Sequence, residues 1–157
     1  MLLPRQPNRD PYPTMVLEVG NRQTGSNILD IRDRMLCWRT SVNVFVTISY
    51  DRNTVRALDS WYVQIAIRDY HAPQPPPGSA NDYPQCIIVY ETPKDGPRYP
   101  KLADPLPPAA RSYTLETRHL YHPEVPPAPP FVNPPIPHSF IFNVEQVRQT
   151  ILRSRPP

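Results

Sequence analysis

The stretch Met15-Val16-Leu17-Glu18-Val19-Gly20, residues 15–20, decides the fold that the sequence predicts. Four apolar residues stand around one acid, and a glycine closes the run, a pattern typical of a strand covered on both faces. Burying a carboxylate without a partner costs several kcal/mol. We therefore expect Glu18 to be paired, protonated or bound to a metal ion, and the functional interpretation depends on this residue.

A helix and a second strand follow this run. Ser26 can cap the helix. Apolar residues then recur every three or four positions, at Ile28, Ile31, Met35 and Trp38. Residues 42–50 alternate apolar and polar side chains, which predicts a strand with one buried face and leaves Phe45 as an exception. Strand, helix and strand within residues 14–50 predict a βαβ-like unit with two parallel strands.

Two more strands and a second helix complete the predicted fold. Residues 61–68 alternate apolar and polar side chains and residues 86–90 form a short apolar run, so each range predicts a strand. Asn143, with Gln146 three residues later, resembles a capping box and predicts the start of a C-terminal helix. The sequence thus indicates an α/β fold with a central mixed sheet, a strand-helix-strand core and a C-terminal helix.

Proline dominates the connections between these elements. The length of 157 residues favours one domain, and 25 of the residues are proline. Residues 1–13 predict an extended N-terminal arm, and residues 14–157 a single domain. Long proline-rich insertions predict irregular or polyproline-like loops. They lie at residues 71–82, 93–108 and 123–137.

Charge and cysteine content narrow the function classes. Lys and Arg number 17 against 14 Asp and Glu, and the net charge of +3 favours polyanions only mildly. Cys37 and Cys86 have no zinc-type spacing, so we expect neither a disulfide framework nor a zinc site. No apolar run is long enough for a signal peptide or a membrane span. We expect a soluble, intracellular protein that needs no cofactor and has no membrane partner.

Helical spacing selects a partner for Glu18. Arg32 follows Ile28 by four residues, so it shares the helix face that packs on the sheet. Asp33 and Arg34 point more outward. We therefore expect Arg32 to face Glu18 and to neutralise its carboxylate.

A longer pattern begins with Pro13-Thr14, three apolar residues and Glu18-Val19. It continues with a short polar loop, an amphipathic helix and a strand. Through this pattern, residues 11–70 resemble the restriction-endonuclease-like PD-(D/E)XK superfamily. They are most similar to small families whose signature is Pro-Asp, three apolar residues and Glu-Val. The resemblance implies that an Asp and the Glu hold a divalent metal ion, while a Lys displaced onto the helix orients the attacking water.

The sequence departs from that pattern in two residues and in length. Thr14 stands where the family has Asp, and a neutral hydroxyl is a poor ligand for Mg²⁺. Arg32 stands near the place of the Lys, and it can hold a phosphate but cannot act as a base because it stays protonated. The family also places a helix and two strands before the Glu strand. We expect those elements to come from a partner, or the domain to be truncated or degenerate, and the exposed sheet edge predicts a homo-oligomer.

Three functions remain open at this point. The first is a catalytically impaired nuclease-like domain that binds DNA or RNA or acts as a scaffold. Its candidate nucleic-acid contacts are Arg22, Arg34 and Arg39. The second is a nuclease that uses Mg²⁺ or Mn²⁺, with Glu18 and Arg32 as catalytic residues. Its candidate metal ligands are Glu18, Asp30 and Asp33. The third is an interaction module whose proline-rich loops bind partner proteins.

Overall fold

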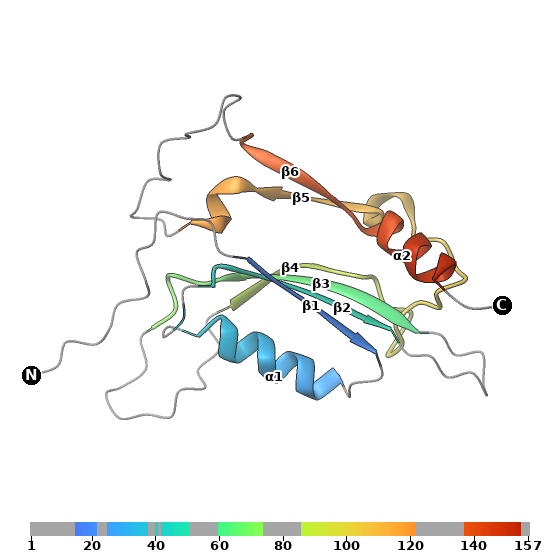
Figure 1. The fold of residues 1–157 in the computed structure, drawn as a ribbon, viewed down its shortest axis with the longest axis horizontal. Helices are drawn as coiled ribbons and strands as arrows, with labels where there is room; N and C mark the ends of the chain where they lie inside the picture. The colour runs from blue at the N-terminus through green and yellow to red at the C-terminus, as the bar shows by residue number, and fades with distance from the viewer. Residues whose placement is uncertain are drawn as a thin grey trace, which may run out of the picture.

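The computed structural model describes residues 15–21, 25–37, 40, 42–50, 60–73, 86–121 and 137–154. Its elements are β1 (Met15–Asn21), α1 (Gly25–Met35), β2 (Val44–Tyr50), β3 (Trp61–Arg68), β4 (Cys86–Glu91), the short 3-10 helix η1 (Pro108–Ala110), β5 (Ser112–Glu116), the 3-10 helix η2 (Thr117–Leu120), β6 (Ser139–Asn143) and α2 (Val144–Arg153). They form three layers: helix α1 covers one face of a four-strand sheet, and the β5–β6 pair with α2 covers the other (Figure 1). The predicted α/β class is confirmed.

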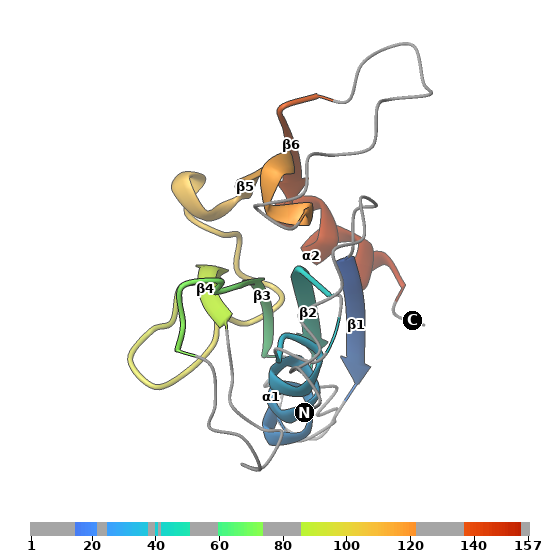
Figure 2. The same cartoon turned by 90° about the vertical axis from the view of Figure 1, so that its left-hand side faces the viewer.

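The main sheet is mixed, as the sequence predicted. Its strand order is β1-β2-β3-β4. Strands β1 and β2 are parallel and joined through α1, while β2–β3 and β3–β4 are antiparallel. A second sheet, which the sequence did not reveal, pairs β5 with β6. Figure 2 shows β1 and β4 at opposite edges of the main sheet.

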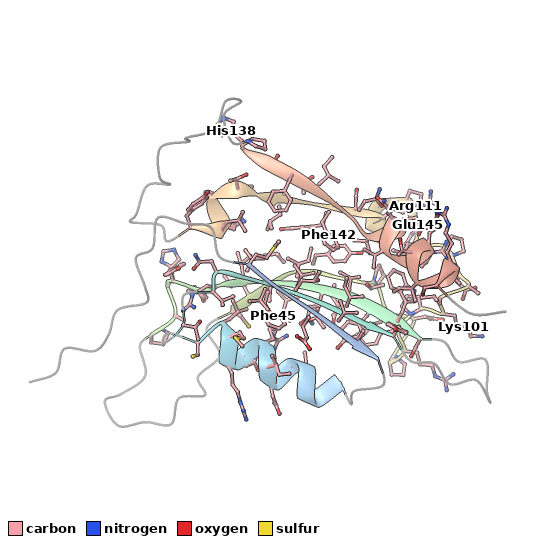
Figure 3. All side chains as sticks on the ribbon, viewed as in Figure 1. Phe45, Lys101, Arg111, His138, Phe142 and Glu145 are labelled. Carbon is pink, nitrogen blue, oxygen red and sulfur yellow. The ribbon has the colours of Figure 1, made fainter. Side chains whose placement is uncertain are left out.

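The larger core lies between the main sheet and the second layer. Val46, Val63 and Ile65 are at most 2% exposed on this face of the sheet. The second layer contributes Leu115 of β5, and Phe142 of β6 packs against the cluster and points toward the sheet (Figure 3). Leu102 and Leu106 also belong to this cluster. The proline-rich residues 93–108 are therefore irregular, as expected, but they contribute to the core rather than forming a free arm.

A smaller apolar cluster lies under α1. Leu36, Phe45 and Ala66 are fully buried there. Phe45 points from β2 toward α1 (Figure 3), so both faces of β2 are covered, which explains why Phe45 broke the alternation of its strand. Met35, predicted to lie on the buried helix face, is 39% exposed, and Leu36 occupies the buried position instead. Trp38 lies outside the described residues.

Strand β1 differs from its prediction. A strand covered on both faces was expected, but Met15, Leu17 and Val19 are 50%, 54% and 56% exposed. Glu18 points to the other face and is partly buried. Because β1 is the first strand in the sheet order, the second layer buries its neighbours on β2 and leaves this apolar stripe uncovered.

The C-terminal helix begins as predicted. Asn143 is the N-cap of α2, and its side-chain oxygen accepts a hydrogen bond of 2.9 Å from the backbone N–H of Gln146. Such a cap satisfies one of the donors that every helix leaves open at its start. Within the part of the chain that the structure describes, no helix is long and apolar enough to cross a membrane.

Arg68 fixes the connection between α1 and β2. Its guanidinium is 5% exposed and donates hydrogen bonds to the carbonyl oxygens of Cys37 (2.6 Å), Thr40 (2.9 Å) and Val42 (2.9 and 2.6 Å). Because these acceptors are neutral, no carboxylate offsets the cost of burying the guanidinium. Burial lowers the pKa of Arg68. Three carbonyls that follow the helix thus receive donors from one side chain on β3.

Candidate functional site

A row of polar side chains crosses the main sheet under α1. Glu18 of β1, Thr47 of β2, Gln64 of β3 and Glu91 of β4 are successive partners in the strand register. We call these four residues the polar row. It lies on the face that α1 covers, at the middle of the parallel strands β1 and β2, where Glu18 and Thr47 are each the fourth of seven residues.

Arg32 of α1 lies over the polar row and is 8% exposed. Its guanidinium donates to Gln64 Oε1 at 2.5 Å and makes an ion pair with Asp33 Oδ1 at 2.6 Å. Gln64 in turn donates from Nε2 to Glu91 Oε1 at 3.2 Å. A continuous chain of contacts therefore runs from Asp33 through Arg32 and Gln64 to Glu91.

The predicted pair between Arg32 and Glu18 is wrong. The helix phase was correct, because Arg32 faces the sheet, but the strand beneath it is β3 rather than β1. Within the described ranges, no hydrogen bond or ion pair joins Glu18 to another residue. The Arg32 guanidinium is neutralised by Asp33, its own neighbour on the helix.

Thr47 is the least satisfied member of the polar row. Its side chain is 0% exposed, and among the described residues its hydroxyl has no hydrogen-bond partner. Buried hydroxyls are normally paired, because an unmade hydrogen bond costs about 1–3 kcal/mol. Thr47 sits directly between Glu18 and Gln64 in the register. The unpaired hydroxyl therefore lies next to the acid that the sequence singled out.

Glu91, the last residue of the polar row, contacts residues of the loop after β4. Tyr99 donates to Glu91 Oε1 at 2.8 Å and stacks on Tyr62 with ring centroids 4.4 Å apart. Lys94 lies 3.5 Å from the same carboxylate oxygen. Partial burial acts to raise the pKa of Glu91, but the hydrogen bonds and charges of Tyr99, Lys94 and Gln64 outweigh it and lower that pKa.

Acid is expected to weaken the fold through Glu91. Because its folded pKa lies below the ordinary value of 4.5, the contribution of Glu91 to stability is complete above pH 4.5 and is lost as pH falls through the folded pKa. The variant Glu91→Gln should show a shallower loss of stability below that pH in urea melts. Glu116→Gln, an exposed acid on β5, is the matched control. Equal acid sensitivity of wild type and Glu91→Gln would contradict this assignment.

The predicted metal ligands are not brought together. Asp30 is exposed on α1. Asp33 contacts Arg32 and lies 3.8 Å from the thiol of Cys86 on β4, at the sheet edge opposite Glu18. No group of three His, Cys, Asp or Glu residues that could hold a metal ion occurs in the described part of the chain.

Glu91 is also too far from Glu18 to be a second carboxylate ligand of the same metal ion. It is three strands away from Glu18, a separation of roughly 14 Å at the usual strand spacing. A shared Mg²⁺ or Mn²⁺ ion requires ligand oxygens at about 2.0–2.2 Å from one centre. The two carboxylates of the polar row therefore cannot bind one ion together.

Only one of the predicted nucleic-acid contacts lies in the described ranges. Arg34 is exposed on α1, as its outward phase predicted. Arg22 and Arg39 lie outside the described residues, and so does Thr14.

The sequence did not select Thr47, Gln64 or Glu91. Thr47 and Gln64 are polar residues inside apolar strands, the same signal that selected Glu18, but only the strand register shows that they share one row with it.

Comparison with known proteins gives no match: no protein-family model, no curated protein and no solved structure matches this chain. The resemblance to the PD-(D/E)XK superfamily therefore rests on the sequence pattern alone.

Proposed function

We propose that this chain is a catalytically impaired, restriction-endonuclease-like module that binds nucleic acid without hydrolysing it at a normal rate. The position of Arg32 carries the proposal. The family resemblance places a water-orienting Lys near this position, whereas Arg32 is buried and its guanidinium is engaged by Gln64 and Asp33. An arginine held in this way serves to fix α1 on the sheet and is not available to orient a water molecule.

The environment of Glu18 supports the same proposal. Metal-dependent hydrolysis of a phosphodiester needs a second acid beside the first and a group that activates water. The predicted ligands Asp30 and Asp33 lie on α1, and Glu91, the other acid of the polar row, lies at the opposite sheet edge. Glu18 alone is a weak centre for a divalent ion.

Binding of a polyanion is supported by Arg34 and by the net charge of +3. Arg34 is the exposed arginine among the described residues of α1, and the acid Asp30 is exposed on the same helix. An exposed arginine can neutralise a phosphate of DNA or RNA without reading the bases. The proposed contact surface is therefore the part of α1 around Arg34.

Replacing Arg34 with glutamine is expected to weaken DNA binding and to reduce the salt dependence. Each phosphate contact that is lost should lower the slope of log K against log salt by about one. Fluorescence anisotropy with a labelled single- and double-stranded oligonucleotide measures both quantities. Arg153→Gln is the control, because it removes the same charge from α2, on the opposite face of the sheet (Figure 1). An equal effect of the two variants would contradict a contact surface on α1.

One observation favours the alternative, a phosphodiesterase that uses Mg²⁺ or Mn²⁺. The unpaired hydroxyl of Thr47 lies in register beside Glu18, and together they offer two oxygen ligands to an ion. Saturable ion binding that depends on both Glu18 and Thr47, with cleavage of DNA, would distinguish this enzyme from the binding module.

A further inference from the structure

The outer edge of β1 carries a surface that the proposed function does not use. Among the described strands, β1 pairs only with β2. Met15, Leu17 and Val19 are at least half exposed, while their register partners Val44, Val46 and Ile48 are at most 8% exposed. The larger core therefore ends at β1, where exposed apolar side chains lie beside a strand edge that no other described strand pairs with.

Strand β1 lacks most of the devices that keep edge strands from pairing, and its one inward-pointing charge is Glu18. Its sequence Met15–Asn21 contains no proline and no Lys or Arg, and its single charge, Glu18, points to the opposite face from the apolar stripe. Edge strands of monomeric proteins are usually protected by such charges, by prolines or by a bulge. The seven residues of β1 form a regular strand that can template another.

The pattern of β1 fits a second copy of itself. In an antiparallel pair centred on Leu17, Leu17 lies opposite Leu17 of the second copy, and Met15 lies opposite Val19. The two apolar stripes then meet on one face, and on the other face each Glu18 lies opposite a Val16. A pair centred on Glu18 would instead place two carboxylates opposite each other, which is unfavourable.

We propose that β1 pairs antiparallel with β1 of a second copy about a twofold axis at Leu17. The two four-strand sheets become one continuous sheet, and the larger cores of the two copies are joined by six apolar side chains. Figure 2 shows that β1 lies at the edge of the sheet. The pairing joins the outer edges of the two β1 strands, so it leaves the exposed side of α1, the proposed nucleic-acid surface, free.

Cysteine crosslinking tests the pairing and its register together. Residues directly opposite in an antiparallel pair have Cβ atoms about 4.5–5.5 Å apart, so Leu17→Cys should form a disulfide-linked dimer under mild oxidation. Val19→Cys alone should not, because the two copies of residue 19 would be about 13 Å apart along the strands. A mixture of Met15→Cys and Val19→Cys chains should crosslink. The wild type, with Cys37 and Cys86 only, is the background control.

Sedimentation analysis supplies a second measurement that does not depend on oxidation. The wild type should approach twice the chain mass as concentration rises, whereas Leu17→Lys should remain at the single-chain mass with an unchanged circular dichroism spectrum, because Leu17 is 54% exposed in the single chain. A wild type that stays monomeric, or equal crosslinking of Leu17→Cys and Val19→Cys, would overturn the proposal. Protection of Leu17→Cys from alkylation in a monomeric chain would also overturn it, because it would show another occupant of the edge.

Discussion

Replacing Arg68 with methionine is expected to lower the free energy of unfolding by about 3–5 kcal/mol. Three carbonyl oxygens lose the guanidinium as a donor, and of these the oxygen of Cys37 keeps a hydrogen bond from the backbone N–H of Thr40. Each unsatisfied buried acceptor costs about 1–3 kcal/mol. The carbonyls belong to Cys37, Thr40 and Val42, in the connection from α1 to β2. Arg68→Lys should lose most of the same stability, because one ammonium group cannot reach all three oxygens. Urea unfolding followed by tryptophan fluorescence measures the difference.

The control for Arg68 is Arg34, which is exposed on α1. Arg34→Met removes the same charge and should stay within about 0.5 kcal/mol of the wild type, as is usual for surface positions. If Arg68→Met were equally mild, the connection between α1 and β2 would not depend on this guanidinium.

Replacing Phe45 with alanine is expected to cost about 3–5 kcal/mol, the usual range for truncation of a fully buried aromatic side chain. Phe45 is the largest side chain of the cluster under α1, where it packs with Leu36 and Ala66. Its loss should therefore loosen α1 as well as destabilise the sheet. Thermal unfolding measures the first effect, and hydrogen exchange of the α1 amides measures the second.

The matched control for Phe45 is Ile141, which is 70% exposed on β6. Ile141→Ala should change the free energy of unfolding by no more than about 0.5 kcal/mol. A loss below about 1 kcal/mol in Phe45→Ala would contradict a packed cluster between α1 and the sheet, since truncation of a buried aromatic ring should cost more.

The strand-helix-strand core could be predicted because its signals are local. Residues 14–50 contain a short apolar run, a helical repeat and an alternating strand, and each element buries side chains that lie close in sequence. The β5–β6 pair could not be found in the same way. Each strand has five residues, and the strands pair across the proline-rich residues 123–137. Pairing over such a distance leaves no local pattern.

The exposure of β1 shows what an apolar run cannot reveal. A run of this kind predicts a strand, but whether a second layer reaches it depends on the position of the strand in the sheet. Here β1 is at the edge, so Met15, Leu17 and Val19 remain exposed although their register partners on β2 are buried.

The candidate site was predicted in part. The sequence selected Glu18 and Arg32 by burial and helical phase; Arg32 lies between α1 and the sheet, and Glu18 is partly buried on the same face of the sheet. It paired them wrongly, because helical phase gives the face of a helix but not the strand that lies beneath each turn. Gln64, the actual partner of Arg32, is distant in sequence and adjacent only through the sheet order.

The central claim is that the residues around Glu18 do not support metal-dependent hydrolysis, while nucleic acid binds at Arg34 on α1. Calorimetric titration of Mn²⁺ into the wild type, Glu18→Ala and Thr47→Val, followed by a nuclease assay on single- and double-stranded DNA, tests it most directly. We expect the wild type and both variants to give the same titration curve, without saturable Mn²⁺ binding. We also expect the wild type to cleave DNA no faster than Glu18→Ala. Saturable binding that is lost in Glu18→Ala, together with cleavage by the wild type alone, would contradict the account and identify the chain as a metal-dependent nuclease.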